Sequence, residues 1–152
     1  MTKLKIITLG DDQTGVLRKI AEQVDLVEIP ELQTFIDDML ETVAYLGAVG
    51  LAAPQIGVDK QIFVLGNGMV CINPTIIGSS GKITSHAEGC LSVGEDKRYD
   101  IKRIREVTVR YYDREGKLQT AKPRKKLTNI AIQHEIDHLH GKLICDRGKP
   151  RK

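Results

Sequence analysis

Residues 133–138 have the sequence Gln133-His134-Glu135-Ile136-Asp137-His138, which places two histidines four positions apart in a segment with helically spaced apolar residues. Positions i and i+4 of a helix lie on the same face about one turn apart, so both imidazoles can bind one metal ion. Glu135 then lies beside the ion without binding it, and it can take a proton from a water molecule activated by the metal. The stretch therefore predicts a metal-binding helix that contains its own catalytic base.

The apolar neighbours of the two histidines indicate that this helix is buried. They are Ile130, Ile132, Ile136 and Leu139. An alternative interpretation is a core helix whose imidazoles only form hydrogen bonds. Burying two histidines and a glutamate without partners would be costly, which favours a ligand between them.

A third ligand separates the classes of metal protein that contain such a helix. Ile144 stands where a metzincin protease needs a third histidine, so that class is disfavoured. Only 14 residues (139–152) follow His138, which leaves little room for the downstream glutamate ligand of other zinc proteases. The thiols of Cys90 and Cys145 remain, since sulfur suits a borderline metal. Cys90 follows a glycine that permits close backbone approach, whereas Cys145 lies in an apolar run typical of a core, so we favour Cys90.

A second unusual segment has the sequence Gly50-Leu51-Ala52-Ala53-Pro54-Gln55-Ile56-Gly57. Small residues bracket one amide, Gln55, and such an amide can donate a hydrogen bond to a developing oxyanion. The alternative is a tight turn with a structural glutamine. A phosphate-binding loop is poorly supported, because no Lys-Ser or Lys-Thr pair follows the glycines.

The composition is that of a soluble globular protein, with 41% apolar residues, 28% charged residues and a formal net charge of +3. We expect the 152 residues to form one domain, residues 1–152. No apolar run is long enough to span a membrane, and residues 1–8 are too short an apolar segment for a signal peptide, so we expect a cytoplasmic protein. Three widely spaced cysteines without a CxxC pair argue against a disulfide framework.

Hydrophobic periodicity predicts three helices and two hairpins. The helices are expected at residues 14–24, from Pro30 to about Gly47, and from about Leu127 to Gly141. The hairpins are expected at 61–65 with 69–72, where Asn73-Pro74 ends the second run, and at 106–112 with 117–120. Helices at both ends of an antiparallel region indicate an α+β fold, in which antiparallel β-sheets pack around the central metal-binding helix and further helices lie near the N-terminus.

Three segments together resemble the motifs of the peptide deformylase family. They are Gly50-Leu51-Ala52-Ala53-Pro54-Gln55, Glu88-Gly89-Cys90-Leu91-Ser92 and Gln133-His134-Glu135-Ile136-Asp137-His138, in the family's order. The resemblance extends from the helix after Pro30 through Asp146. It implies hydrolysis of the N-formyl group from N-formylmethionyl peptides of newly made proteins, with release of formate. From the residues alone, two alternatives stay open: a metalloprotease or other amide hydrolase with the same triad, and a non-enzymatic protein with a structural metal site.

The resemblance also implies a role for each motif residue. A water molecule bound to the metal would attack the formyl carbon, with Glu135 as the general acid and base. Gln55, through its side-chain amide, and Leu91, through its backbone N–H, would donate to the oxyanion. The implied ion is ferrous iron, and zinc or nickel can occupy the same site. The implied metal ligands are Cys90, His134 and His138.

Substrate binding and support of the metal site follow from the same resemblance. The residues expected to line an apolar pocket for the methionine side chain are Leu127, Ile130 and Ala131. Gly50 and Gly89 would pair with the peptide backbone. Glu88 would pair with Arg103 and so support the loop that contains Cys90.

Two basic segments, residues 122–126 and 147–152, are interpreted either as solvated chain or as contacts with the ribosome near its peptide exit. We expect a monomer.

Overall fold

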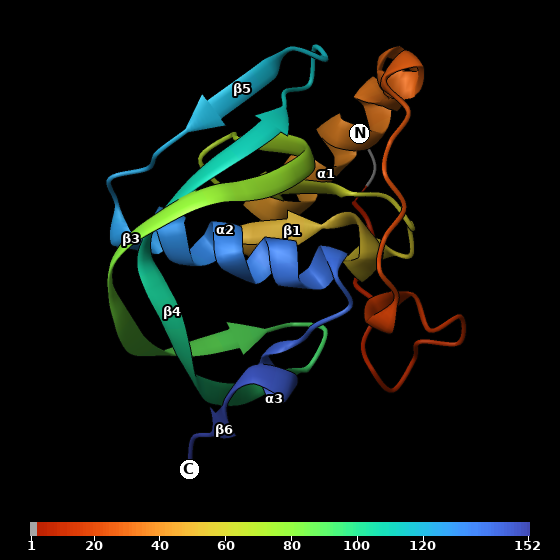
Figure 1. Ribbon diagram of the computed structural model, residues 1–152. Coiled ribbons are helices and arrows are strands. Elements are labelled where there is room, and N and C mark those ends of the chain that lie inside the picture. The colour runs from red at the N-terminus through yellow and green to blue at the C-terminus, as the bar shows by residue number, and fades with distance from the viewer. Residues whose placement is uncertain (1–2) are drawn as a thin grey trace.

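The long strands β3 (Val70–Cys90) and β4 (Gly94–Tyr112) bend around helix α2 (Lys126–Leu139), so that the helix lies in the curve of an antiparallel sheet (Figure 1). This computed structural model describes residues 3–152, and residues 1 and 2 of the segment considered as a signal peptide lie outside the described residues. The α+β fold class predicted from the sequence is confirmed. Among residues 3–152, no helix is both long and apolar enough to cross a membrane.

The strands form one sheet in the order β1-β2-β3-β4-β5, and β6 pairs with β4. Their bounds are β1 Gly50–Ala52, β2 Ile62–Leu65, β3 Val70–Cys90, β4 Gly94–Tyr112, β5 Leu118–Ala121 and β6 Lys149–Pro150. The helices are α1 Gln33–Leu46, α2 Lys126–Leu139 and α3 Ile144–Arg147, with 3₁₀ turns η1 Val16–Arg18, η2 Leu26–Leu32 and η3 Ala53–Ile56.

Helix α2 is joined to β4 by amide side chains as well as by apolar packing. Strand β5 pairs with one end of β4 and β6 with the other, so within the described residues the middle of that edge of β4 has no strand partner. There the backbone N–H of Val107 donates to Asn129 Oδ1 at 2.8 Å, and that of Ile104 donates to Gln133 Oε1 at 3.1 Å. Gln133 Nε2 returns a bond to the Ile104 carbonyl at 2.8 Å. These bonds satisfy buried backbone groups and fix the position of α2 along the strand.

The first of the predicted helices is largely absent. Residues 14–24 contain only the η1 turn, and Ile20, placed on the expected apolar face, is 70% exposed. Gly15 has φ 72°, and the Asp12 carboxylate accepts hydrogen bonds from the next two backbone N–H groups, which closes a short turn. Beyond it, the Ala21 N–H donates to the Leu139 carbonyl at 2.8 Å. These tertiary bonds outweigh the weak helical preference of a short segment.

The second predicted helix begins later than expected. Pro30 lies inside the η2 turn, and α1 begins at Gln33. It ends at the predicted residue, because Gly47 has φ 60° and its N–H bonds back to the last turn. The buried face of α1 consists of Ile36, Met39, Thr42 and Val43.

Both predicted hairpins form, but β3 does not end at Asn73-Pro74 as expected. Asn73 has φ 51° at an irregularity in the pairing with β4, and its side chain bonds to both backbone groups of Val24. The strand therefore bends there and continues to Cys90, and β4 likewise begins at Gly94 rather than near Glu106. This longer hairpin brings Cys90 beneath α2.

Candidate metal centre and active site

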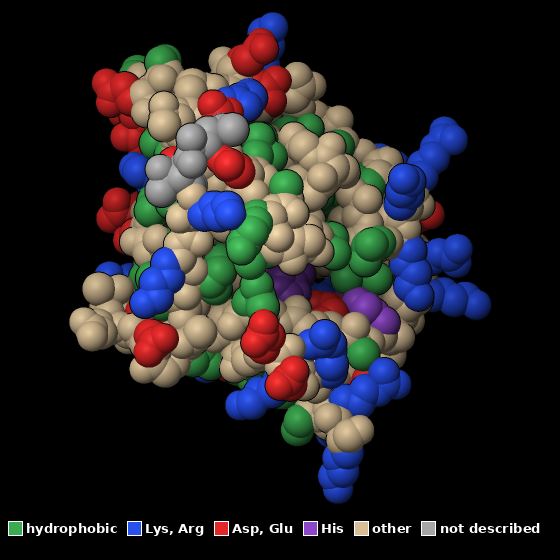
Figure 2. Space-filling model, turned by 180° about the vertical axis from the view of Figure 1, so that it is seen from behind, with side chains coloured by type: hydrophobic (Ala, Val, Ile, Leu, Met, Phe, Trp, Pro, Cys, Tyr) green, Lys and Arg blue, Asp and Glu red, His purple; other side chains and the backbone are tan. Residues whose placement is uncertain are grey.

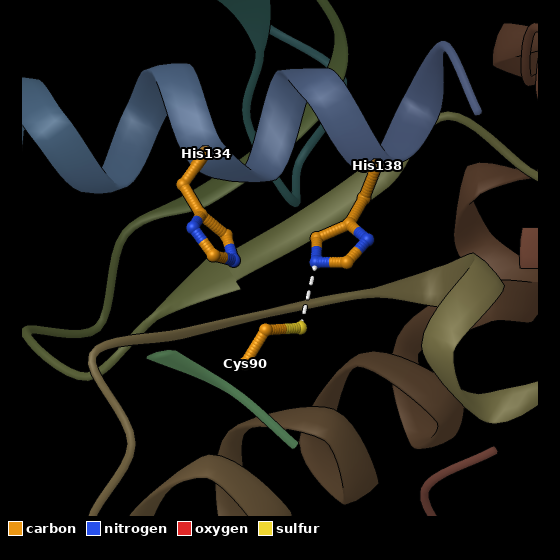
Figure 3. A group of neighbouring side chains, drawn as sticks. All are labelled: Cys90, His134 and His138. Carbon is orange, nitrogen blue, oxygen red and sulfur yellow. Dashed lines mark hydrogen bonds between the residues drawn. The ribbon is translucent and has the colours of Figure 1, made fainter. Parts of the chain in front are cut away.

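One thiol and two imidazoles meet between α2 and the end of β3. The two histidines project from successive turns of α2 toward Cys90, the last residue of β3 (Figure 3). One ligand atom from each residue lies within 4.8 Å of the others. The structure thus brings together the three residues predicted as ligands, Cys90, His134 and His138.

The spacing of these donors fits a tetrahedral metal ion. Zinc-like bond lengths of about 2.3 Å to sulfur and about 2.05 Å to nitrogen, at the tetrahedral angle, put sulfur and nitrogen about 3.6 Å apart. Cys90 Sγ lies 3.5 Å from His138 Nε2. The residues present therefore fit one divalent ion with a thiolate and two imidazole ligands, and a fourth position would be left for water.

Cys145, the alternative ligand, lies elsewhere. It is half-buried in α3, and its Sγ is 3.9 Å from Arg18 Nη2. It is not among the donors grouped around Cys90.

Charges around the metal-free donors favour a cation. Burial would lower the pKa of His134, but the hydrogen bond with Cys90 and the carboxylates of Glu135 and Glu88 raise it to about 10. Burial and the positive charge of His134 lower the pKa of His138 well below its usual value. In the metal-free protein one imidazole therefore holds a proton where a bound ion would otherwise supply positive charge.

Glu88 holds the first of the two imidazoles in place. Its Oε1 lies 2.8 Å from His134 Nδ1, which leaves Nε2 of that ring free to face the metal site. Arg103 donates to both carboxylate oxygens of Glu88, each at 2.9 Å, so the predicted pairing of these two residues is present. Both side chains are buried. The bidentate contact fixes the plane of the carboxylate and hence the orientation of the ring.

Glu88 should make the metal-free protein sensitive to acid. Burial would raise the pKa of this carboxyl, but hydrogen bonds from His134 and Arg103 lower it to about 2, from 4.5. A lowered pKa stabilises the fold above about pH 4.5, and this contribution is lost as the pH falls toward 2; it amounts to about 3 kcal/mol. We expect urea unfolding of chelator-treated wild type to lose stability more steeply between pH 5 and 2 than Glu88→Gln. Parallel curves would contradict this.

Glu135 has the environment of a general base. It is buried, and burial raises its pKa to about 7, while the charge of His134 opposes this rise. Its Oε1 atom makes no hydrogen bond within residues 3–152. A carboxylate that titrates near neutrality and has an oxygen free can accept a proton from a water molecule and return it.

Gln55 is held against the thiol. The N–H of Ala52 donates to Gln55 Oε1 at 3.0 Å, which turns the amide nitrogen toward Cys90 Sγ, 3.6 Å away, and Ser92 Oγ, 3.2 Å away. Both ends of the amide are bonded within the protein, so the interpretation as a structural turn glutamine stays open beside the catalytic one. The amide nitrogen lies beside Cys90 at the cleft, from where an N–H group can donate to a developing negative charge.

The site opens into a cleft with a volume of about 370 Å³. Figure 2 shows the face of the molecule on which it lies. In Figure 2 histidine and acidic side chains lie in a hollow between apolar ones. Of the predicted site residues, the cleft is lined by Gly50, Gln55, Glu88, Gly89, Cys90, Leu91, Leu127, Ile130, Ala131, His134 and Glu135. His138 and Arg103 lie behind this surface and are 1% and 4% exposed.

Several residues at the cleft were not predicted. Arg98 pairs with Gly89 across the β3–β4 hairpin, and its guanidinium occupies the space that a side chain at Gly89 would need. Glu95 and Ile6 also line the cleft. Near Ile6, the Ile7 N–H donates to the Gln55 carbonyl at 2.7 Å. Such contacts come from segments without a catalytic pattern, so the sequence contained no signal for them.

The chain is similar to proteins of one family. A family model described as polypeptide deformylase matches residues 3–152, a longer region than the resemblance from Pro30 to Asp146. A peptide deformylase of Fusobacterium nucleatum is 41% identical, and the alignment covers 96% of this chain and 84% of that protein. The crystal structure of a Synechococcus elongatus peptide deformylase in complex with actinonin has a TM-score of 0.88 and 38% identity, covering 97% of this chain and 80% of that one. The peptide deformylase structure from Thermotoga maritima has a TM-score of 0.88 and 35% identity, covering 99% and 100%.

Proposed function

This chain belongs to the polypeptide deformylase family, whose metallohydrolases remove the N-formyl group from N-formylmethionyl peptides, and from this premise we propose how its residues perform that hydrolysis. The reaction adds water across the formamide bond, releasing formate and a free amino group. The proposal rests on one observation: three side chains that could hold a metal ion lie together with a buried carboxylate that has a free oxygen, and Cys90, His134 and Glu135 line one cleft.

We propose that Cys90, His134 and His138 hold one divalent ion. Ferrous iron is the ion we expect in the cell, and zinc or nickel fit the same donors. When bound, the ion would lower the pKa of a water molecule toward neutrality and polarise the formyl oxygen. Glu88 and Arg103 keep the imidazole of His134 in the orientation that this requires.

Glu135 moves the protons of the reaction. Its free Oε1 accepts a proton from the attacking water and later returns it to the departing amino group. Negative charge that develops on the formyl oxygen is stabilised by the side-chain amide of Gln55 and the backbone N–H of Leu91.

The peptide lies along the cleft. Gly50 of β1 and Gly89 of β3 line the cleft, and an extended chain bound there can pair with their backbone groups. Leu127, Ile130 and Ala131 form the apolar surface for the methionine side chain beside His134. An unbranched, flexible methionine suits such an irregular apolar surface.

Formate release from formyl-Met-Ala-Ser tests the proposed reaction. The protein is loaded anaerobically with ferrous iron or with nickel, and formate and free amine are measured together. We expect equal amounts of the two products. Cleavage of the Met-Ala bond instead would indicate the metalloprotease alternative, and absence of both products from metal-loaded protein would overturn the proposed reaction.

Gly50→Ala should reduce turnover by displacing the base. A Cβ atom at this position would lie 2.7 Å from Glu135 Oε2 and 2.9 Å from Leu65 Cδ2. Both side chains must shift to relieve these contacts, and a displacement of the carboxylate by about 1 Å costs about 10²-fold in rate. Gly10→Ala is the control, since a Cβ there meets no atom within 4 Å. Steady-state formate release measures both variants, and equal activity would contradict the expected displacement.

We further propose that residues 1–152 form one deformylase domain that works as a monomer in the cytoplasm, where newly made formylated chains and reducing conditions occur together. Light scattering tests the oligomeric state.

We also propose contact with the ribosome near the peptide exit. Lys122, Arg124, Lys125 and Lys126 are exposed in the segment that precedes the cleft residue Leu127, and electrostatic binding to RNA would weaken steeply with salt. Salt-insensitive or absent cosedimentation with ribosomes would count against this contact.

A further inference from the structure

We propose that Arg147 is a positioning residue for the metal centre, acting through Asp137 and Arg103 on the carboxylate that orients His134. The inference rests on the proposed metal site and extends it to the C-terminal helix α3. No motif of the metal site includes Arg147. A chain of ionic hydrogen bonds connects Arg147 to His134, one of the proposed ligands. The donor to acceptor distances along it are 2.6–2.9 Å.

The chain of contacts runs through the interior. Arg147 Nη2 donates to Asp137 Oδ1 at 2.7 Å, and Arg103 Nη1 donates to the other oxygen, Oδ2, at 2.6 Å. Arg103 uses its Nε and Nη2 groups for Glu88, which in turn holds His134 Nδ1. The side chains of Arg103, Glu88 and Asp137 are 3%, 5% and 11% exposed, so the inner contacts are shielded from solvent.

Arg147 balances the charge of this chain. Two carboxylates, Glu88 and Asp137, share the single buried guanidinium of Arg103; Glu88 also contacts His134, and Arg147 supplies a further positive charge to Asp137. Without it, Asp137 would compete with Glu88 for Arg103, because a buried carboxylate needs a close cation. A weaker hold of Arg103 on Glu88 would loosen the orientation of the His134 ring. We therefore expect metal affinity, rather than folding alone, to depend on Arg147.

The C-terminal segment is built to present Arg147 at this place. The Leu143 N–H donates to Asp146 Oδ2, which closes the first turn of α3. After Arg147 the chain pairs with β4 through β6, and the Arg151 N–H donates to the Arg98 carbonyl at 2.8 Å. Gly148 permits this approach, since a Cβ there would collide with the carbonyl of Asp100. The backbone of the basic C-terminal segment is thus paired as far as Arg151, while its basic side chains are exposed.

The test compares Arg147→Met with Arg18→Met. Arg18 forms an ion pair of 2.7 Å with Asp146, which lies in α3 next to Arg147. The Arg18 side chain is 49% exposed, against 39% for Arg147. Both changes remove a guanidinium that pairs with a carboxylate, but Arg18 reaches Asp146 from the η1 turn, and only Arg147 contacts Asp137. Nickel and zinc dissociation constants are measured by competition with a chelator, and metal-free protein is checked by circular dichroism. We expect the constants to rise about fivefold in Arg147→Met, less than for a direct partner of a metal-binding histidine, and to stay unchanged in Arg18→Met.

Two further readouts separate positioning from general stability. The visible spectrum of the cobalt-loaded protein reports ligand geometry, and we expect it to change in Arg147→Met only. Arg147→Lys keeps the charge, so its metal affinity should lie closer to wild type than that of the Met variant. Wild-type affinity and spectrum in Arg147→Met would overturn the inference, as would an equal loss in Arg18→Met or an equally large loss in Arg147→Lys. Because metal binding is measured without substrate, a failure of the deformylation proposal would leave these results distinguishable.

Discussion

Glu135→Gln should lower kcat/KM for formyl-Met-Ala-Ser by about 10³-fold or more while the protein keeps its metal ion. The amide has the same shape as the carboxylate but cannot accept a proton from water. The wild-type carboxyl is suited to that task, because burial raises its pKa to about 7 and its Oε1 has no hydrogen-bond partner in the described part of the chain. Formate release at equal metal content, determined by elemental analysis, measures the loss.

Glu95→Gln provides the matched control for this prediction. Glu95 lines the same cleft, but it is exposed and comes from β4 rather than α2. The same chemical change there should leave the rate within about threefold of wild type, since a surface charge mainly affects encounter with the substrate. Nearly full activity of metal-loaded Glu135→Gln would show that another group accepts the proton. Equal losses in both variants would indicate that the net charge of the cleft, not Glu135, limits the rate.

The parts of the fold that sequence predicted are those fixed by local patterns. Helix α2 has apolar residues at helical spacing and a glycine after its end, and it appears within two residues of the expected bounds. The hairpin turn at 66–68 and the end of α1 at Gly47 likewise depend on residues suited to tight turns. Such signals act over a few residues, so they are visible without knowledge of the rest of the chain.

The errors of the fold prediction arise where distant residues decide the backbone. The expected helix at 14–24 is replaced by an irregular segment, because Asp12 caps the η1 turn and Leu139 bonds to Ala21. The continuation of β3 past Asn73 depends on a contact with Val24, 49 residues away. Neither partner is identifiable from the neighbouring sequence.

The candidate site was predicted more fully than the fold around it. Binding a metal ion and transferring a proton each require particular side chains, such as thiol, imidazole and carboxylate. These residue types can be recognised in the sequence by their spacing. Arg98 and Arg147, in contrast, are two of the many basic residues of this chain, and only their positions beside Gly89 and Asp137 distinguish them. The position of Arg98 depends on the bend of the β3–β4 hairpin, and that of Arg147 on the pairing of the C-terminal segment with β4. No local sequence pattern specifies either.

Cys90→Ser should abolish both metal binding and deformylation, whereas Cys145→Ser should affect neither. The serine hydroxyl is not ionised at neutral pH and is a poor ligand for a borderline ion held by two imidazoles. Loss of a direct ligand should exceed the effect of losing an outer partner, so we expect the nickel dissociation constant to rise more than about 100-fold. Chelator competition and formate release measure the two properties.

The two cysteines test the ligand assignment against each other because their surroundings differ. Cys90 Sγ lies 3.5 Å from His138 Nε2 and 3.6 Å from Gln55 Nε2, whereas Cys145 Sγ lies 3.9 Å from a surface arginine, Arg18. Cys90→Ser removes one of the three donor groups and leaves both imidazoles on α2 in place, so we expect the variant to remain folded but to bind metal weakly. If Cys145→Ser instead lost the ion and Cys90→Ser kept it, the thiolate ligand would have to come from α3, and the geometry of the open fourth position would need to be assigned again.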